Sequence, residues 1–156
     1  MRAVGAACLL AVALIICRAI GDAERRRLRE TEEALALLRA IKAGITCGLL
    51  PLEEIYRSFD SPALSACGFL GILREGGDYG VAVRSSALPE EVRARLVSFG
   101  ALLGRSGRER EGELCDYYIA ELETLLATVR QEGAVRLRSR RVATVTGTLM
   151  LVLLLL

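Results

Sequence analysis

The sequence predicts an all-α protein in which a helical bundle is anchored in a membrane by one transmembrane helix at each end. Three observations lead to this: an uncharged apolar run at either end, helical spacing of apolar residues between the runs, and no alternating apolar and polar stretch long enough for a strand. The chain has 156 residues, 53% of them hydrophobic and 26% charged, so it is too apolar for a disordered protein. We therefore expect an N-terminal anchor at 1–21, a cytoplasmic helical bundle at 22–141 and a C-terminal anchor at 142–156.

The N-terminal run, residues 3–17, contains 15 uncharged residues. It reaches about 18 residues, just enough to span a bilayer, if the Arg18 guanidinium extends to the lipid headgroups. A cleaved signal peptide with Arg2 as its basic region is the alternative interpretation. No A-x-A cleavage site follows the run, and four arginines occur at 25–29, so an uncleaved anchor is favoured.

The C-terminal run, residues 142–156, also contains 15 uncharged residues. As a helix it would be roughly 22 Å long, which is less than the ~30 Å hydrocarbon core of a bilayer. It would therefore tilt little, thin the bilayer or end within the far leaflet. A buried core helix is the alternative, but the final LVLLLL offers no polar face to water.

Arginines next to the two runs predict the orientation. Ten of them lie on the side of the middle segment, against Arg2 and the N-terminal amine on the far side. Because arginine-rich flanks remain in the cytoplasm, the middle segment should be cytoplasmic, with both termini pointing across the cell membrane. The ten are Arg18, Arg25, Arg26, Arg27, Arg29, Arg130, Arg136, Arg138, Arg140 and Arg141.

The first half of the middle segment predicts three helices. A long amphipathic helix continues from the first anchor, is apolar at Leu28, Leu35, Leu38, Ile41, Ile45 and Leu49, and is broken near Gly44 and Gly48. Pro51, followed by two glutamates, starts a short helix that ends near Phe59. Ser61 and Pro62 start a third helix, which ends at the loop of residues 75–78.

The second half also predicts helices. Residues 81–86 could form a strand in isolation, but a single strand has no partner, so we expect a short helix. Pro89 starts the next helix, which is apolar at Val92, Leu96, Phe99 and Leu103 and ends at Gly104. After a linker at 105–107, a long helix continues into the second anchor along the seam of Leu114, Tyr118, Leu122, Leu125 and Val129. The first and last helices should therefore lie side by side.

Composition argues against an enzyme, a nucleic-acid partner and a cofactor. The chain has no His, which excludes Ser-His-Asp catalysis and His-ligated metals, and it has no Walker sequence. Residues 22–141 carry 19 basic and 19 acidic residues, so there is no basic excess for phosphate backbones. Cys47, Cys67 and Cys115 lack CxxC spacing, and we expect them to be reduced, buried and unmetallated.

Charged and aromatic residues near the start of the last helix are the candidate partner contacts. Arg105, Arg108 and Arg110 lie at a helix start, where the helix dipole favours acids, which makes them unusual there. Tyr117 and Tyr118 point about 100° apart on a helix, so we expect one in the core and the other on the surface. The alternative for the arginines is a solvated helix face on which they pair with the carboxylates Glu109, Glu111, Glu113, Asp116, Glu121 and Glu123. A hydrolase using two of these carboxylates is the remaining enzyme hypothesis.

Several segments together resemble the stage III sporulation protein AB family of endospore-forming Firmicutes. These are TCGLLPL at 46–52, FGALLG at 99–104, Leu122 with Glu123, and the apolar tail. Where the family tends to carry an Asp-Arg pair and a Gln, this chain has Gly107, Arg108 and Glu111. The family-like positions are Pro51, Leu52, Phe99, Gly100, Leu103, Gly104 and Glu123.

The resemblance implies a fold and a function. The fold would be a helical bundle similar to the cytoplasmic domains of type II secretion platform proteins, in the mother-cell membrane around the forespore. The protein would be a non-enzymatic part of the channel complex between the two cells, and its partners would be the bilayer, a secretion-type ATPase and ring or channel proteins of the same operon. No nucleic acid or small-molecule substrate is implied. A platform protein of another export or pilus-type system is the alternative.

Overall fold

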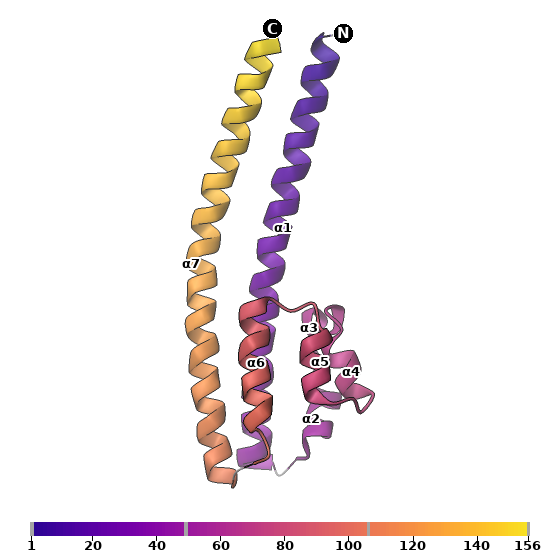
Figure 1. Cartoon of the computed structure of the whole chain (residues 1–156), viewed down its shortest axis with the longest axis vertical. Helices are drawn as coiled ribbons and strands as arrows, with labels where there is room; N and C mark the ends of the chain where they lie inside the picture. The colour runs from indigo at the N-terminus through magenta and orange to yellow at the C-terminus, as the bar shows by residue number, and fades with distance from the viewer. Residues whose placement is uncertain (1, 49, 106, 156) are drawn as a thin grey trace. The chain divides into compact units, whose positions relative to one another are not determined.

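The computed structural model describes residues 2–48, 50–105 and 107–155, and every regular element in these ranges is a helix. Within the helices, the side chains of 2–10, 13, 48, 108, 134, 136–138, 140–141, 148–149 and 151–155 are outside the description. The elements are α1 (Arg2–Ala43), the π-helix η1 (Gly44–Gly48), α2 (Leu52–Ser58), α3 (Pro62–Ala66), α4 (Phe69–Arg74), α5 (Tyr79–Ser85), α6 (Glu90–Leu102) and α7 (Arg108–Leu155) (Figure 1). The all-α prediction is confirmed.

The chain forms two compact units. We call Met1–Arg26 together with Thr128–Leu156 the end unit, and Arg27–Ala127 the bundle unit. The helices α1 and α7 are continuous and contribute to both. In the end unit the two helices approach each other, since a Cβ added to Gly133 would lie 3.8 Å from Oε2 of Glu24. The boundaries expected at 21 and 141 refer to a membrane and stay a prediction.

In the part of the chain that the structure describes, no helix combines the length and the apolar character needed to cross a membrane. Most side chains of the proposed second anchor, and those of residues 2–10 in the first, lie outside the described part.

In the bundle unit, α6 lies between α7 and the group of short helices (Figure 1). Phe99 on α6 contacts Tyr79 of α5 and Tyr118 of α7, with ring centroids 6.4 and 5.6 Å apart. The predicted apolar seams are confirmed, because most of their members are buried. These are Leu35, Leu38 and Ile41 on α1, Val92, Leu96 and Phe99 on α6, and Tyr118, Leu122 and Leu125 on α7; the last member of the α7 seam, Val129, is also buried and belongs to the end unit.

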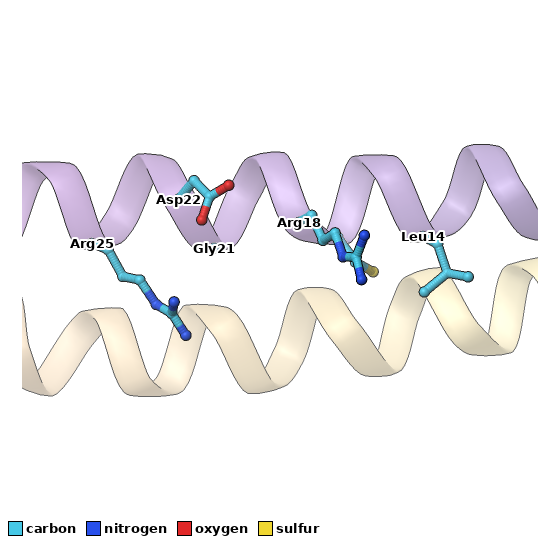
Figure 2. A pocket seen from close by; sticks show the side chains of 6 residues that line it. Leu14, Arg18, Gly21, Asp22 and Arg25 are labelled. Carbon is cyan, nitrogen blue, oxygen red and sulfur yellow. The ribbon is translucent and has the colours of Figure 1, made fainter.

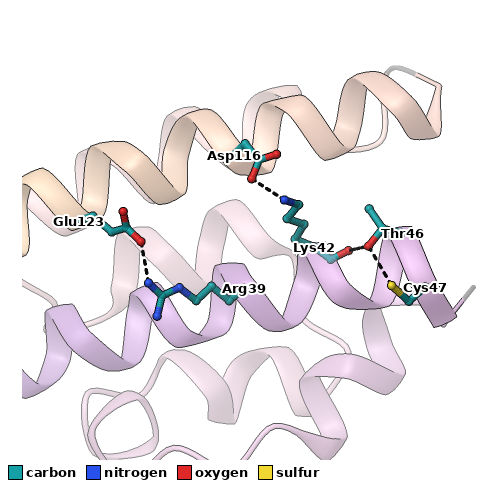
Figure 3. Close-up of polar contacts among 6 residues, drawn as sticks. All are labelled: Arg39, Lys42, Thr46, Cys47, Asp116 and Glu123. Atoms are coloured by element: carbon teal, nitrogen blue, oxygen red, sulfur yellow. Dashed lines mark hydrogen bonds and ion pairs between the residues drawn. The ribbon is translucent and has the colours of Figure 1, made fainter.

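The first and last helices lie side by side in the bundle unit, as expected. Two ion pairs connect them: the Arg39 guanidinium lies 2.6 Å from the Glu123 carboxylate, and the Lys42 ammonium 2.5 Å from that of Asp116 (Figure 3). All four side chains are at least one-third exposed. Such pairs contribute about 0–1 kcal/mol each, so the buried seams supply most of the stability.

The predicted third helix is wrong as a single element. Gly68 has φ +83° and separates α3 from α4, because a left-handed residue cannot continue an α-helix. The predicted start at Ser61 and Pro62 is correct: the Ser61 hydroxyl accepts a hydrogen bond from the amide of Leu64 at 3.2 Å. Glu33 on α1 adds a second cap, since its carboxylate accepts from the amide of Ala63 at 2.7 Å.

The short helix expected at 81–86 is confirmed as α5, although it starts earlier, at Tyr79. The Asp78 carboxylate caps it by accepting a hydrogen bond from the amide of Val81 at 3.0 Å. The helix is held against the core by its fully buried Ala82 and Val83.

Close packing joins α5 to α6. A Cβ added to Gly100 would overlap the ring of Tyr79, so only a glycine lets the aromatic ring lie against the α6 backbone. The interior has no spare volume at this point.

We expect Gly100→Ala to destabilise the bundle by about 1–3 kcal/mol, because the new methyl group displaces the Tyr79 ring. Urea unfolding of the full-length chain, followed by circular dichroism, measures this. Gly71→Ala is the matched control: Gly71 is an exposed helical glycine with no neighbour within 4 Å of an added Cβ, so the change should stabilise by about 0.5–1 kcal/mol. Equal effects of the two variants would contradict the packing.

Candidate functional site

A series of aromatic rings runs through the bundle unit and ends at the surface. Tyr79 contacts the rings of Tyr56 and Phe69 at 6.4 and 5.8 Å between centroids, and Phe99 continues the series to Tyr118. The last contact is edge-on, at 5.2 Å, between Tyr118 and its neighbour Tyr117. Such pairs contribute about 0.5–1.5 kcal/mol beyond the area they bury. An exposed aromatic side chain is thus held by a rigid core.

Tyr117 and Tyr118 occupy the two environments expected of them. The side chain of Tyr118 is 8% exposed and packs in the core, whereas that of Tyr117 is 61% exposed. Large aromatic side chains at the surface are enriched in protein interfaces, and burying one gives a large gain in binding energy. Tyr117 therefore remains the aromatic candidate for partner contact.

The exposed face of α7 around Tyr117 carries charges of both signs. Arg110, Glu113 and Tyr117 follow at steps of three and four residues, which places them on one helix face, and all three are exposed. We call these three residues the α7 outer face. Its alternation of a cation, an anion and an aromatic ring suits a polar protein surface better than a lipid or a nucleic acid.

The three predicted arginines lie at different points of the backbone, one in a connection and two at the start of α7. Arg105 lies in the connection between α6 and α7, after Gly104, whose φ is +78°. Arg110 is in the first turns of α7, and both side chains are exposed. Arg108 is the first residue of α7, and its side chain lies outside the described part. Neither Arg105 nor Arg110 forms an ion pair with another residue of that part, and both side chains are exposed to solvent.

The carboxylates of α7 pair differently from the expectation. Asp116, Glu121 and Glu123 do not pair with Arg105 or Arg110, but bind cations on other helices. Asp116 and Glu123 pair with α1, and Glu121 lies 3.3 Å from the guanidinium of Arg95 on α6. These pairs join helices far apart in the sequence, which local spacing does not predict. Three of the carboxylates considered for the hydrolase hypothesis are thus held in ion pairs.

The cysteines occupy two environments. Cys67 and Cys115 are buried, as predicted, and burial together with the nearby Asp116 and Glu111 raises the pKa of the Cys115 thiol to about 11. The prediction was wrong for Cys47, which is exposed because η1 turns it towards solvent. Among the described residues, no group of three or more Cys, Asp or Glu side chains is arranged to hold a metal ion.

The family-like positions have structural roles in this chain. The Pro51 carbonyl accepts the amide of Glu54 at 3.0 Å and starts α2, on which Leu52 is half-buried. Phe99 is fully buried, Leu103 is the C-cap that follows α6, and Gly104 supplies the left-handed turn. Gly100 receives the Tyr79 ring, and Glu123 binds Arg39.

The comparisons give no relative: no family model, characterised protein or solved structure matches this chain.

Tyr79 is the residue of this region that the sequence analysis missed. Its hydroxyl is buried without a hydrogen-bond partner among the described groups, and burial raises its pKa well above the usual value. A single tyrosine after a Gly-Gly-Asp loop does not indicate, from the sequence alone, that its ring and hydroxyl are buried. The signal lies in its partner Gly100, an otherwise unexplained glycine inside a helix.

We expect Tyr79→Phe to stabilise the bundle by about 1–3 kcal/mol, because it removes a buried hydroxyl that has lost its water and gained no partner. Thermal unfolding of the full-length chain measures the change. Tyr117→Phe is the control and should have almost no effect, since the Tyr117 side chain is exposed. A loss of stability in Tyr79→Phe would show that the hydroxyl is bound.

The pH dependence of stability is a second test of the burial of Tyr79. Burial raises the pKa of Tyr56 to about 12 and that of Tyr79 well above its usual value, so both stay neutral in the folded chain while the unfolded chain ionises near pH 10. The stability that these two neutral tyrosines contribute is therefore fully present below pH 10 and falls as the pH rises from 10 to 12. Tyr79→Phe should make this fall shallower.

Proposed function

We propose that this chain is a non-enzymatic, membrane-bound platform protein: the end unit attaches it to a bilayer, and the bundle unit binds a partner protein. The observation that carries the proposal is the exposure of large apolar side chains in the end unit. Eight of them are between 48% and 67% exposed: Val12, Leu14, Ile15, Ile16, Val135, Val142, Val145 and Met150. Extended apolar surface of this kind marks a membrane or protein contact.

A bilayer is the cover that fits these side chains best. Runs 3–17 and 142–156 contain no charged residue, and arginines follow the first and precede the second. Each large apolar side chain moved from water into an apolar medium contributes about 1.5–3 kcal/mol, so several together bind strongly even where a helix is short. The flanking arginines would add attraction to anionic headgroups.

The bundle unit supports a role in contact rather than catalysis. Its buried interior is mainly apolar and aromatic, and three of the α7 carboxylates, Asp116, Glu121 and Glu123, are engaged in ion pairs across helices. The α7 outer face and Arg105 present charged and aromatic groups on a rigid support. We propose that a protein of mixed surface charge docks there.

The more specific form of the proposal follows the resemblance to the stage III sporulation protein AB family. In this form the membrane is the mother-cell membrane around the forespore, and the partner is a secretion-type ATPase together with ring or channel proteins. The order of the segments TCGLLPL, FGALLG and the apolar tail supports it. The structural roles of Gly100 and Gly104 are compatible with it, since packing requires the first glycine and a left-handed turn requires the second.

We expect the full-length chain, expressed in a bacterial membrane, to stay in the pellet after alkaline carbonate washing, because apolar side chains buried in lipid resist a wash that removes peripheral proteins. Immunoblotting of pellet and supernatant measures the distribution. Val142→Asp with Val145→Asp should move a large share of the protein to the supernatant. Release of the unaltered chain would contradict membrane insertion.

We expect the α7 outer face to be needed for partner recovery after cross-linking in sporulating cells. Tyr117→Ala with Arg110→Glu should lower the yield of the ATPase about tenfold, the effect of losing ~1.4 kcal/mol at an interface hot spot. Quantitative mass spectrometry of the purified complex measures this.

The control is Arg57→Glu, a charge reversal at an exposed arginine on α2. It should leave the yield unchanged, and the membrane-bound amount of each variant should equal that of the unaltered chain. Equal losses in both variants would place the partner surface elsewhere. Recovery of no ATPase with the unaltered chain would contradict the sporulation-specific form of the proposal.

A further inference from the structure

The end unit contains an open groove of about 450 Å³ along α1, which none of the contacts described above uses. Figure 2 shows its lining, formed by Leu14, Cys17, Arg18, Gly21, Asp22 and Arg25. The groove is apolar at the Leu14 end and charged at the Arg25 end.

The lining is a continuous face of one helix. Leu14, Arg18, Gly21 and Arg25 follow at steps of four, three and four residues, which brings them to one side of α1. The two arginines are about 10 Å apart along the helix axis. Gly21 between them has no side chain, so the space between the two guanidinium groups is open.

The charge in the groove is predominantly positive. Arg18 and Arg25 are exposed, and neither guanidinium group forms an ion pair with another described residue. In Figure 2 the Arg25 guanidinium extends towards the neighbouring helix α7, whereas the Asp22 carboxylate lies over the ribbon of α1. Two guanidinium groups and one carboxylate therefore line the groove, which leaves it with a net positive charge.

We propose that this groove binds the phosphate group of an anionic phospholipid, with the phosphate between Arg18 and Arg25 and an acyl chain along Leu14. Guanidinium groups bind phosphate oxygens through paired hydrogen bonds and are the preferred side chain for this purpose. The inference rests on the proposed membrane attachment, and it adds a specific ligand and a specific site.

The position of the groove in the chain favours a lipid over a free anion. The uncharged run 3–17 directly precedes Arg18, and Leu14 belongs to both the run and the groove. A ligand that fits must therefore carry a negative headgroup and an apolar tail. A zwitterionic lipid fits less well, because its ammonium group would be repelled by the two arginines.

The test uses the full-length chain in neutral detergent micelles, titrated with phosphatidylglycerol or with phosphatidylcholine of the same acyl chains. We expect phosphatidylglycerol to bind at least tenfold more tightly. Arg18→Ala with Arg25→Ala should reduce its affinity about 25-fold, which is fivefold for each arginine near a lipid surface. The matched control Arg29→Ala removes an exposed arginine of α1 that does not line the groove, and should change the affinity less than twofold.

Cys17 gives a local second measurement, because it lines the groove, whereas Cys47 lies in the bundle unit. Phosphatidylglycerol should slow maleimide labelling of Cys17, read by mass spectrometry of its peptide, and leave the labelling of exposed Cys47 unchanged. Inorganic phosphate at millimolar concentration should protect Cys17 little. Equal protection by phosphate would overturn the lipid as the ligand.

Two further results would overturn the site. One is equal affinity for the two lipids, and the other is an equal loss in Arg29→Ala and in the double variant. Both can occur while the chain still resists carbonate washing, in which case the groove is wrong and membrane attachment stands. Release by carbonate would instead reject the attachment, independently of the micelle titration.

Discussion

The bundle unit depends on the packing of the Tyr79 ring against the α6 backbone at Gly100. This contact brings α5 to α6, and Phe99, the residue before Gly100 on α6, contacts the ring of Tyr118 on α7. Without a glycine at position 100, the ring would have to leave the core, and the short helices would lose their main attachment. The Tyr79 ring, through the bare backbone at Gly100 and the rings of Tyr56 and Phe69, thus joins α2, α4 and α5 to α6, and these three helices are too short to be stable alone.

The ion pairs between α1 and α7 have a different role. Because they are partly exposed, Arg39 with Glu123 and Lys42 with Asp116 add little free energy, but they favour one register of the two helices. A slip by one turn would separate both pairs and misalign the seams that contain Leu38 and Leu122. The α7 outer face is thereby held at a defined orientation to the rest of the bundle unit.

The sequence predicts local features of the fold better than it predicts the contacts between elements. Helical spacing correctly placed Leu38, Ile41 and Leu122 in the core, and prolines and serines correctly marked the helix starts. The break at Gly68 was missed because the apolar spacing continues across it. The pairing of Lys42 with Asp116 was missed because it joins residues 74 positions apart. The candidate groove was missed because the sequence of a helix does not show which side of the helix stays uncovered. The partner-contact residues were chosen by type and position, and among those whose side chains the structure describes, Arg110 and Tyr117 share one face.

The position of Tyr117 at the end of the aromatic series has an optical consequence. The chain has four tyrosines and no tryptophan, so its ultraviolet emission comes from tyrosine alone. Tyr56, Tyr79 and Tyr118 are largely shielded by neighbouring side chains, whereas Tyr117 is open to collisional quenchers such as iodide. The protein therefore contains a natural fluorophore at the surface where we propose that a partner docks, and the arrival of that partner can be followed without an attached dye.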